Sequence, residues 1–292
     1  MLLLACGREA PTGPDQPPNP PPIPPPVTPP ALDEVFVGAG DIGWCGPDGR
    51  PSQTAALLDA VAGSVIFVAG DAAYFSGSLD DYLKCYEPSW GRFKTRTRPA
   101  PGNHDYETPG AAGYFAYFGA SAWPPGGYYN YTLGAWHIVA LNSQISAFPG
   151  SPQMDWLRSD LIANPSLCTL AYFHTPVFGS GTNGGNEQMR AVWRVLYEFG
   201  VDLVINGHNH SYERFAPQDP DGNPNSARGI REIVVGTGGA PLTDFPRIRA
   251  NSEIHSSTWG VLKLTLRADR YDWQFVPVAG ASFSDTGTAT CH

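Results

Sequence analysis

The sequence predicts an α/β fold, because buried strands alternate with amphipathic helices along most of its length. Residues 35–71 have the pattern of a strand, a helix and a second strand, a unit that implies parallel pairing. The same alternation returns between residues 152 and 206. Beyond residue 231, three strand patterns follow one another with no long helix between them, so we expect the last third to pair antiparallel.

The first unit begins with VFVGAGD (35–41), an apolar run that ends in a polar turn. Ser52 stands where it could cap a helix over QTAALLDAVA (53–62), whose apolar residues recur at helical spacing before Gly63 ends it. SVIFVAGD (64–71) then repeats the strand pattern together with its terminal Gly-Asp pair.

The middle of the chain repeats this order of elements. Ser151 and Pro152 open a helix through QMDWLRSDLIA (153–163), and CTLAYFH (168–174) follows as a strand. Asn186 begins a helix over EQMRAVWRVLYEF (187–199), which Gly200 closes before the strand VDLVIN (201–206). The later strand patterns are REIVVGTGG (231–239), GVLKLTL (260–266) and YDWQFVPV (271–278).

The N-terminal residues differ in composition from the rest of the chain. Residues 1–10 resemble the truncated end of a bacterial lipoprotein signal, because LLAC (3–6) places a small residue before Cys6, which would carry lipid. The alternative is an ordinary start with a stray cysteine. In residues 11–31 prolines dominate, which predicts an extended polyproline linker; docking of proline-binding modules is the weaker alternative. Residues 32–292 are expected to form one domain.

The net charge of −9 argues against a nucleic-acid surface, because phosphate backbones are bound by clustered Lys and Arg. No segment approaches the roughly 20 apolar residues of a membrane span, so membrane contact is expected only through a lipid on Cys6. We therefore expect small partners and no protein partner. The predicted location is extracytoplasmic, either secreted or lipid-anchored to a bacterial cell surface.

Residues able to bind metal follow the predicted strands. Isolated Gly-Asp pairs are usually turns, and strand-terminal histidines are usually structural, but here five such stretches occur in order. Ligand sites of α/β sheets lie outside the carboxyl ends of the strands. The donors are oxygen and imidazole nitrogen, which suit zinc, manganese or iron. The stretches are GDIG (40–43), GDAAY (70–74), PGNHD (101–105), YFH (172–174) and GHNH (207–210).

The pair His208 and His210 is informative within this set. In extended backbone, side chains two residues apart point the same way, so the two rings are expected on one side of the chain. Taken alone, the pair would be read as a polar turn after a strand.

These five blocks resemble the calcineurin-like metallophosphoesterases, and most closely the purple acid phosphatases. General members of that superfamily have D-x-H in the first block, where this chain has Gly43 in place of the histidine. The second block has the form D-x-x-Y, whose Tyr74 replaces the missing ligand, as in the purple enzymes. The resemblance implies a mixed two-sheet β-sandwich flanked by helices, in four layers αββα.

Carried over residue by residue, the resemblance implies two metal sites that share Asp71. One holds Fe(III) through Asp41, Asp71, Tyr74 and His210; the other holds Zn, Mn or Fe(II) through Asp71, Asn103, His174 and His208. His104 is implied as a proton donor or phosphate contact. Asp105 is implied to orient the ring of His104, although the purple enzymes commonly have glutamate at that position.

The implied activity is hydrolysis of small phosphate esters, with phosphomonoesters favoured, by attack of metal-bound hydroxide. A phosphodiesterase with the same site is the alternative, and a catalytically silent cell-surface binding protein is a third possibility of a different class.

Further expectations concern residues outside the blocks. Cys45 and Cys85 follow the first strand and the second block, so a disulfide between them would join two loops at the ligand edge. Cys168 opens a buried strand and is expected in the core, while Cys291 could not be placed. His137 is expected to be a structural histidine, and the aromatic stretch 113–131 is expected to pack under a long loop.

Overall fold

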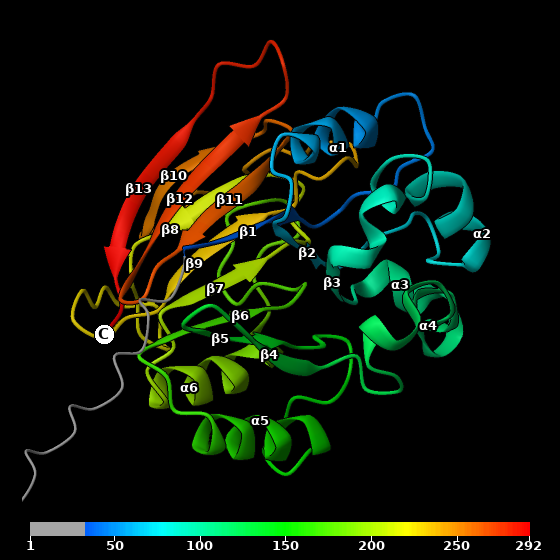
Figure 1. The fold of residues 1–292 in the computed structure, drawn as a ribbon. Coiled ribbons are helices and arrows are strands. Elements are labelled where there is room, and N and C mark those ends of the chain that lie inside the picture. Colours follow the sequence, from blue (N-terminus) through cyan, green and yellow to red (C-terminus); the bar gives the residue numbers. More distant parts are fainter. Residues whose placement is uncertain (1–32) are drawn as a thin grey trace, which may run out of the picture. The chain divides into compact units, whose positions relative to one another are not determined.

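The computed structural model describes residues 33–292, so the predictions for Cys6, residues 1–10 and the 11–31 linker lie outside the described residues. The described part contains two mixed sheets (Figure 1). The strands are β1 (Glu34–Ala39), β2 (Val65–Ala69), β3 (Thr97–Ala100), β4 (Tyr129–Leu133), β5 (Trp136–Ala140), β6 (Cys168–Tyr172), β7 (Leu203–Asn206), β8 (Tyr212–Phe215), β9 (Arg231–Val235), β10 (Ser252–Ser256), β11 (Gly260–Leu266), β12 (Arg270–Pro277) and β13 (Asp285–Thr290).

The helices are mostly short and lie between the strands. They are α1 (Pro51–Asp59), α2 (Leu79–Asp81), α3 (Asn103–Glu107), α4 (Ala112–Phe118), α5 (Pro152–Ala163) and α6 (Arg190–Glu198). Short 3₁₀ or π segments occupy Tyr82–Tyr86, Trp90–Arg96, Pro109–Ala111, Gly119–Ala122 and Glu187–Met189.

The predicted parallel units form the centre of each sheet. One sheet has the order β13-β12-β11-β1-β2-β3, in which β1, β2 and β3 are parallel. The other has the order β10-β8-β9-β7-β6-β5-β4, with β5, β6, β7 and β9 parallel. The expectation of antiparallel pairing after residue 231 is therefore wrong for β9 on its β7 side, because the short β8 inserts as a hairpin partner on the other side.

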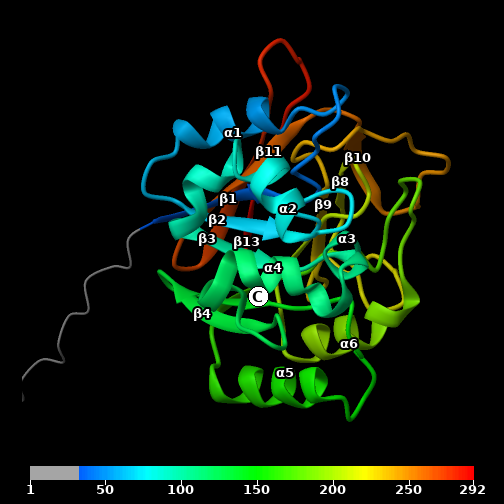
Figure 2. The same ribbon diagram turned by 90° about the vertical axis from the view of Figure 1, so that its right-hand side faces the viewer.

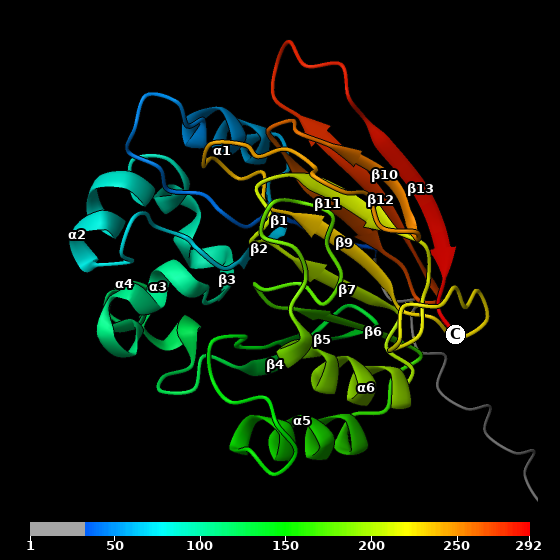
Figure 3. The ribbon, with the colours of Figure 1, turned by 180° about the vertical axis from the view of Figure 1, so that it is seen from behind.

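The core lies between the two sheets, and a second apolar layer lies under two helices. Alternate residues of β5–β7 face opposite ways: Ile138, Leu170 and Ile205 join the inter-sheet core, whereas Val139 and Val204 pack in the layer that includes α5 and α6. Figures 1 and 3 show α5 and α6 on the outer face of the seven-stranded sheet. α1 packs beside β11 of the other sheet. The predicted two-sheet sandwich with flanking helices is confirmed.

One local prediction needs correction. α1 begins at Pro51, not after Ser52, and Arg50 is the residue before it; the ring of Pro51 is already set for the first helical turn. The aromatic stretch 113–131 forms most of α4 and the start of β4. Its rings do pack as expected, with Tyr114, Phe118 and Tyr129 buried.

Two disulfides close the structure. Cys45–Cys85 is confirmed, with Cα atoms 4.9 Å apart. Cys168 is buried as expected, but it also pairs with Cys291 across 5.3 Å between Cα atoms, which ties the C-terminal residues to the first residue of β6. Sequence reasoning left Cys291 unplaced because its distance along the chain from Cys168 gives no indication of proximity.

We predict that replacing Cys168 and Cys291 with serine lowers the free energy of unfolding by about 2–4 kcal/mol, because the bond closes a loop of 123 residues. Urea unfolding followed by circular dichroism measures the change. The metal-binding side chains come from the other end of β6, so metal content should stay unchanged; an unaltered unfolding midpoint would contradict the prediction.

Candidate metal centre

The candidate site lies beyond the carboxyl ends of β1, β2, β3, β6 and β7, which is where the sequence predicted it. Figure 2 looks onto the helices α2, α3 and α4, which follow β2 and β3 along the chain. The polar residues come directly after the strands: Asp41 after β1, Asp71 after β2, Asn103 after β3, His174 after β6 and His208 after β7.

Unusual backbone conformation positions the two aspartates. Asp41 and Asp71 adopt left-handed conformations, with φ of 61° and 49°, so the chain turns sharply as each strand ends. The glycine before Asp71 is required, because a Cβ on Gly70 would lie 2.4 Å from the ring of His174. Gly102 is equally constrained, since its Cβ would lie 2.2 Å from Asp71 Oδ1. Glycine at these two positions thus reflects crowding around the site.

The second oxygen of each aspartate is held by a backbone amide. The His208 amide donates to Asp41 Oδ2 and the His104 amide donates to Asp71 Oδ1, each at 2.8 Å. Asp41 Oδ1 and Asp71 Oδ2 therefore remain for the centre. Both carboxylates are fully buried, at 0% and 1% exposure, so their charge has to be balanced locally.

One group of side-chain atoms surrounds the hydroxyl of Tyr74. The Tyr74 hydroxyl donates to Asp41 Oδ1 at 2.8 Å and lies 3.2 Å from Asp71 Oδ2. It is 3.0 Å from His210 Nε2, which is itself 3.2 Å from Asp41 Oδ1. Ligands about 2.1 Å from an octahedral ion lie about 3 Å from their neighbours. These spacings fit one bound cation.

A second group shares Asp71 Oδ2 with the first. His174 Nε2 lies 3.1 Å from Asp71 Oδ2 and 3.0 Å from Asn103 Oδ1. His208 Nδ1 lies 3.2 Å from His174 Nε2, so two ring nitrogens face each other. Candidate donor atoms of Asp41, Asp71 and His174 all lie within 4.8 Å of one another. The arrangement fits a second cation next to the first, with the Asp71 carboxylate between them.

Backbone carbonyls fix which nitrogen of each ring is free. His174 Nδ1 contacts the carbonyl of Ala69 at 2.8 Å, and His210 Nδ1 contacts the carbonyl of Pro241 at 2.8 Å. A carbonyl only accepts, so both Nδ1 atoms carry protons and both Nε2 atoms offer lone pairs to the centre when the rings are neutral. Lone pairs then converge on carboxylate and amide oxygens, an arrangement that a cation stabilises.

The pKa shifts agree with a centre that favours positive charge. Burial opposes ionisation of His174, but Asp71 and Asp41 raise its pKa to about 9. Burial also opposes ionisation of Asp41, yet the charges of His210 and His174 hold its pKa well below the usual value. In contrast, burial and the neighbouring His174 lower the pKa of His208 to about 4, so this ring is a neutral donor.

His104 and Asp105 lie beside the group but are arranged differently from the expectation. His104 Nδ1 lies 2.6 Å from the carbonyl of Phe75, which orients the ring and leaves Nε2 free. Asp105 instead accepts hydrogen bonds from the Tyr82 hydroxyl at 2.5 Å and from the Gly102 amide at 2.8 Å. Its carboxylate therefore fixes the start of α3, and the orienting role expected for it belongs to the Phe75 carbonyl.

The extended backbone assumed for His208 and His210 is also wrong. His208 has φ of 71°, so the chain is left-handed there and the two rings diverge. The His210 ring joins the Tyr74 group, and the His208 ring joins the His174 group. Sequence reasoning did not find the carbonyls of Ala69, Phe75 and Pro241, because a backbone acceptor has no residue-type signal. His137 is the structural histidine expected, with its Nε2 2.7 Å from Asp160 Oδ2.

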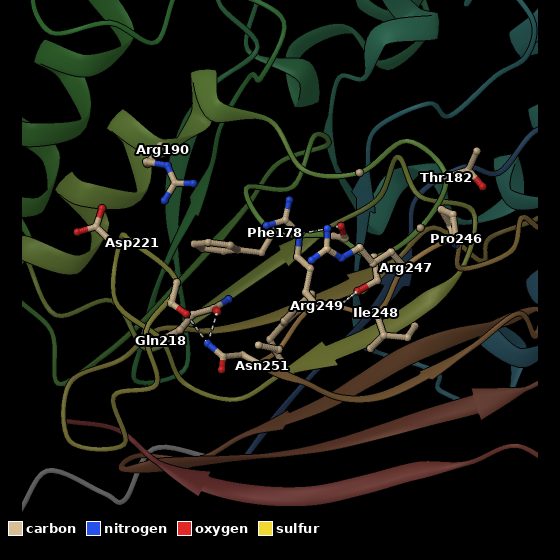
Figure 4. A pocket seen from close by; sticks show the side chains of 17 residues that line it. Phe178, Thr182, Arg190, Gln218, Asp221, Pro246, Arg247, Ile248, Arg249 and Asn251 are labelled. Carbon is tan, nitrogen blue, oxygen red and sulfur yellow. Dashed lines mark hydrogen bonds between the residues drawn. The ribbon is translucent and has the colours of Figure 1, made fainter.

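A separate pocket of about 600 Å³ contains none of the predicted site residues (Figure 4). Arginines and amides line it, among them Arg190, Arg249 and Gln218. Its wall includes residues 178–182 and 184, and between them Asn183 Nδ2 donates to the His208 carbonyl at 2.6 Å. The pocket therefore shares a loop with the candidate centre but is not part of it.

Comparison with known proteins places the chain in a family. Residues 35–212 match the family described as calcineurin-like phosphoesterase, and the chain belongs to it. Among the residues that the structure describes, no helix is both long and apolar enough to cross a membrane.

Its relatives with known names include acid phosphatases. The chain is 30% identical over 188 residues to purple acid phosphatase 15 of Arabidopsis thaliana, which covers 51% of this chain and 35% of the relative. It is 26% identical over 258 residues to human acid phosphatase type 7, and this match covers 71% of this chain and 56% of the relative. Matches to the first curated relatives span between about a third and a half of those proteins.

The fold has solved counterparts. A purple acid phosphatase isolated from yellow lupin seeds superimposes with a TM-score of 0.72 at 18% identity, over 89% of this chain and 54% of that one. Together, the family match, the acid phosphatases among the relatives and this fold confirm the resemblance to purple acid phosphatases stated from the sequence.

Proposed function

We propose that this protein is a dinuclear-metal hydrolase of phosphate esters, with phosphomonoesters as its preferred substrates. Asp71 would be shared by two cations. Asp41, Tyr74 and His210 would complete one metal site, and Asn103, His174 and His208 would complete the other. One observation carries this proposal: two groups of donor atoms meet at Asp71 Oδ2, and neighbouring donor atoms within each group lie about 3 Å apart.

The donor types differ between the two proposed sites. The first contains a phenol and two carboxylates, hard donors that favour Fe(III); the second has two imidazoles, an amide oxygen and the shared carboxylate, which suit Zn, Mn or Fe(II). When bound, two such ions clamp phosphate oxygens and lower the pKa of water so that a nucleophile forms near neutral pH. The remaining steps fall to the protein's own side chains.

His104 is the proposed proton donor to the leaving group. Its Nδ1–H donates to the Phe75 carbonyl, so Nε2 is the atom that exchanges the second proton. Asp105 acts as a positioning residue: through the Gly102 amide it fixes the start of α3, the helix that carries both Asn103 and His104. Human and plant acid phosphatases among the relatives favour a monoesterase.

The direct test combines metal analysis with activity on two ester classes. Protein purified without chelator should contain about two equivalents of transition metal per chain, and it should hydrolyse aryl phosphate monoesters faster than the matching diesters. Faster diester hydrolysis would favour the phosphodiesterase alternative. A protein that binds metal but hydrolyses neither ester would favour the silent binding protein.

A His104→Ala variant should lose more activity on substrates whose leaving group is more basic. With ethyl phosphate, whose alkoxide needs a proton, we expect turnover to fall about 10²–10⁴-fold. With 4-nitrophenyl phosphate, whose leaving group needs little proton assistance, the fall should be much smaller. His255→Ala serves as the control, because His255 is exposed on β10 outside the centre. Equal losses on both substrates would make His104 a phosphate contact instead of an acid.

We also propose that the protein works outside the cytoplasm, on the evidence of two disulfides, which persist in oxidising compartments. Lipid on Cys6 and a spacer over residues 11–31 would attach the domain that begins at residue 32 to a bacterial cell surface. Metabolic labelling with a palmitate analogue, compared between wild type and Cys6→Ala, tests the anchor.

A further inference from the structure

An exposed aromatic ring lies next to the proposed proton donor. Phe75 follows Tyr74 in the chain and leaves 62% of its surface exposed. Single exposed apolar residues are common and need no explanation by themselves. The position of this one is distinctive, because its carbonyl holds the ring of His104 at 2.6 Å and the neighbouring Tyr74 ring lies 4.5 Å from the imidazole.

The backbone that carries Phe75 is fixed although its ring is exposed. The next residue, Ser76, donates its amide to Asp81 Oδ2 at 3.1 Å, and its carbonyl accepts from the Thr108 amide at 3.0 Å. The Ser76 hydroxyl donates to the same Asp81 oxygen at 2.7 Å. The phenyl group therefore projects from an ordered segment, and its exposure is a property of the fold.

Trp44 supports the ring from one side. The two ring centroids lie 4.5 Å apart at an interplanar angle of 65°, an edge-to-face contact. The indole nitrogen donates to Asp48 Oδ1 at 2.8 Å, and the adjacent Cys45 is joined to Cys85. Trp44 is thus held by its own loop, and together with Phe75 it forms a preorganised aromatic surface beside His104.

The chemistry of ester cleavage decides what meets this surface. A general acid has to be within hydrogen-bond reach of the leaving oxygen, either directly or through one water. The group attached to that oxygen therefore extends past His104, and the exposed apolar side chain next to His104 is Phe75. A flat ring on the leaving alcohol can stack there, whereas a one- or two-carbon alcohol has no ring to stack.

We propose that Phe75, supported by Trp44, is a specificity-determining subsite for phosphate monoesters whose alcohol carries an aromatic ring. The inference rests on the proposed function and narrows its substrate class. Aromatic pairs are stabilised beyond the effect of area burial, so the preference should be about three- to tenfold. It should depend on the Phe75 side chain and not on its carbonyl.

The test compares benzyl phosphate with ethyl phosphate, which both release a primary alcohol and so make similar demands on the acid. In Phe75→Ala, kcat/KM for benzyl phosphate should fall about three- to tenfold, and that for ethyl phosphate should change less than about twofold. For Phe75→Leu, which keeps apolar area without a ring, kcat/KM for benzyl phosphate should lie between the values of wild type and Phe75→Ala. Calorimetric titration with benzylphosphonate and ethylphosphonate should show the same selectivity in binding.

Leu167→Ala is the matched control, since Leu167 is 59% exposed but lies just before β6, at the end of that strand away from His174. It should leave both substrates unaffected. Equal losses on both substrates in Phe75→Ala, or no loss on either, would overturn the subsite while leaving the phosphatase intact. A wild-type protein that hydrolyses neither ester would instead refute the proposed function, and the subsite with it.

Discussion

An Asp71→Asn variant is expected to lose metal from both sites and nearly all turnover. Asp71 Oδ2 is the atom that the two donor groups share, at 3.2 Å from the Tyr74 hydroxyl and 3.1 Å from His174 Nε2. Loss of a residue that only orients a metal ligand costs about 10- to 100-fold in affinity or activity. Removing a shared charged ligand should therefore cost more than about a hundredfold in turnover.

The measurement pairs metal content per chain with turnover of an aryl phosphate. Asparagine keeps the shape of the side chain and the acceptor for the His104 amide, so circular dichroism should show an intact fold. Asp80→Asn is the control, because Asp80 is an exposed aspartate of α2 paired only with Lys84. A variant that retained two metals per chain and wild-type turnover would remove Asp71 from the centre.

Much of the candidate site was predictable because its residues follow strand ends. In a parallel sheet those ends meet at one edge, so Asp41 and Asp71 had to come close once β1 and β2 were recognised. His174 follows β6 of the other sheet and joins them because the two sheets pack against each other. The order of the blocks then indicated the family. Periodicity locates the strands, because apolar runs of strand length between helices are local signals, whereas the ligand set came from the resemblance to the family.

The parts that failed depend on contacts between distant segments. The pairing of β9 with β7 is parallel because β8 forms a short hairpin with β9 on the other side, which no local pattern distinguishes from an antiparallel meander. The Cys168–Cys291 bond likewise joins residues 123 apart. Such features follow from the packed fold and not from neighbouring sequence.

Local geometry explains the remaining differences within the site. The left-handed backbone at His208 arises where its amide turns to donate to Asp41 Oδ2, a contact across 167 residues. Asp105 was expected to face His104, but its carboxylate is directed into the buried hydrogen bond with Tyr82. In both cases the residue type indicated a role at the site, but the sequence did not predict which residue it would contact.

A Tyr74→Phe variant is expected to lose the visible absorption that we propose for the iron-loaded protein. Tyr74 is buried, with 2% of its surface exposed. Its hydroxyl lies among Asp41 Oδ1, Asp71 Oδ2 and His210 Nε2, so it is placed to bind the ion of that site as a phenolate. Ferric iron bound to phenolate absorbs visible light. Phenylalanine fills the same space without an oxygen, so the band should disappear and iron binding should weaken.

The second site provides the internal comparison, because Asn103, His174 and His208 do not depend on the phenol for their positions. Tyr74→Phe should therefore still bind a divalent ion there, and metal analysis should show about one equivalent per chain in place of two. Tyr106→Phe, which removes a tyrosine hydroxyl that accepts a hydrogen bond from Asn142 and lies on α3, should keep the band. Iron-loaded wild-type protein without a visible band, or Tyr74→Phe with the band intact, would exclude Tyr74 as a ligand.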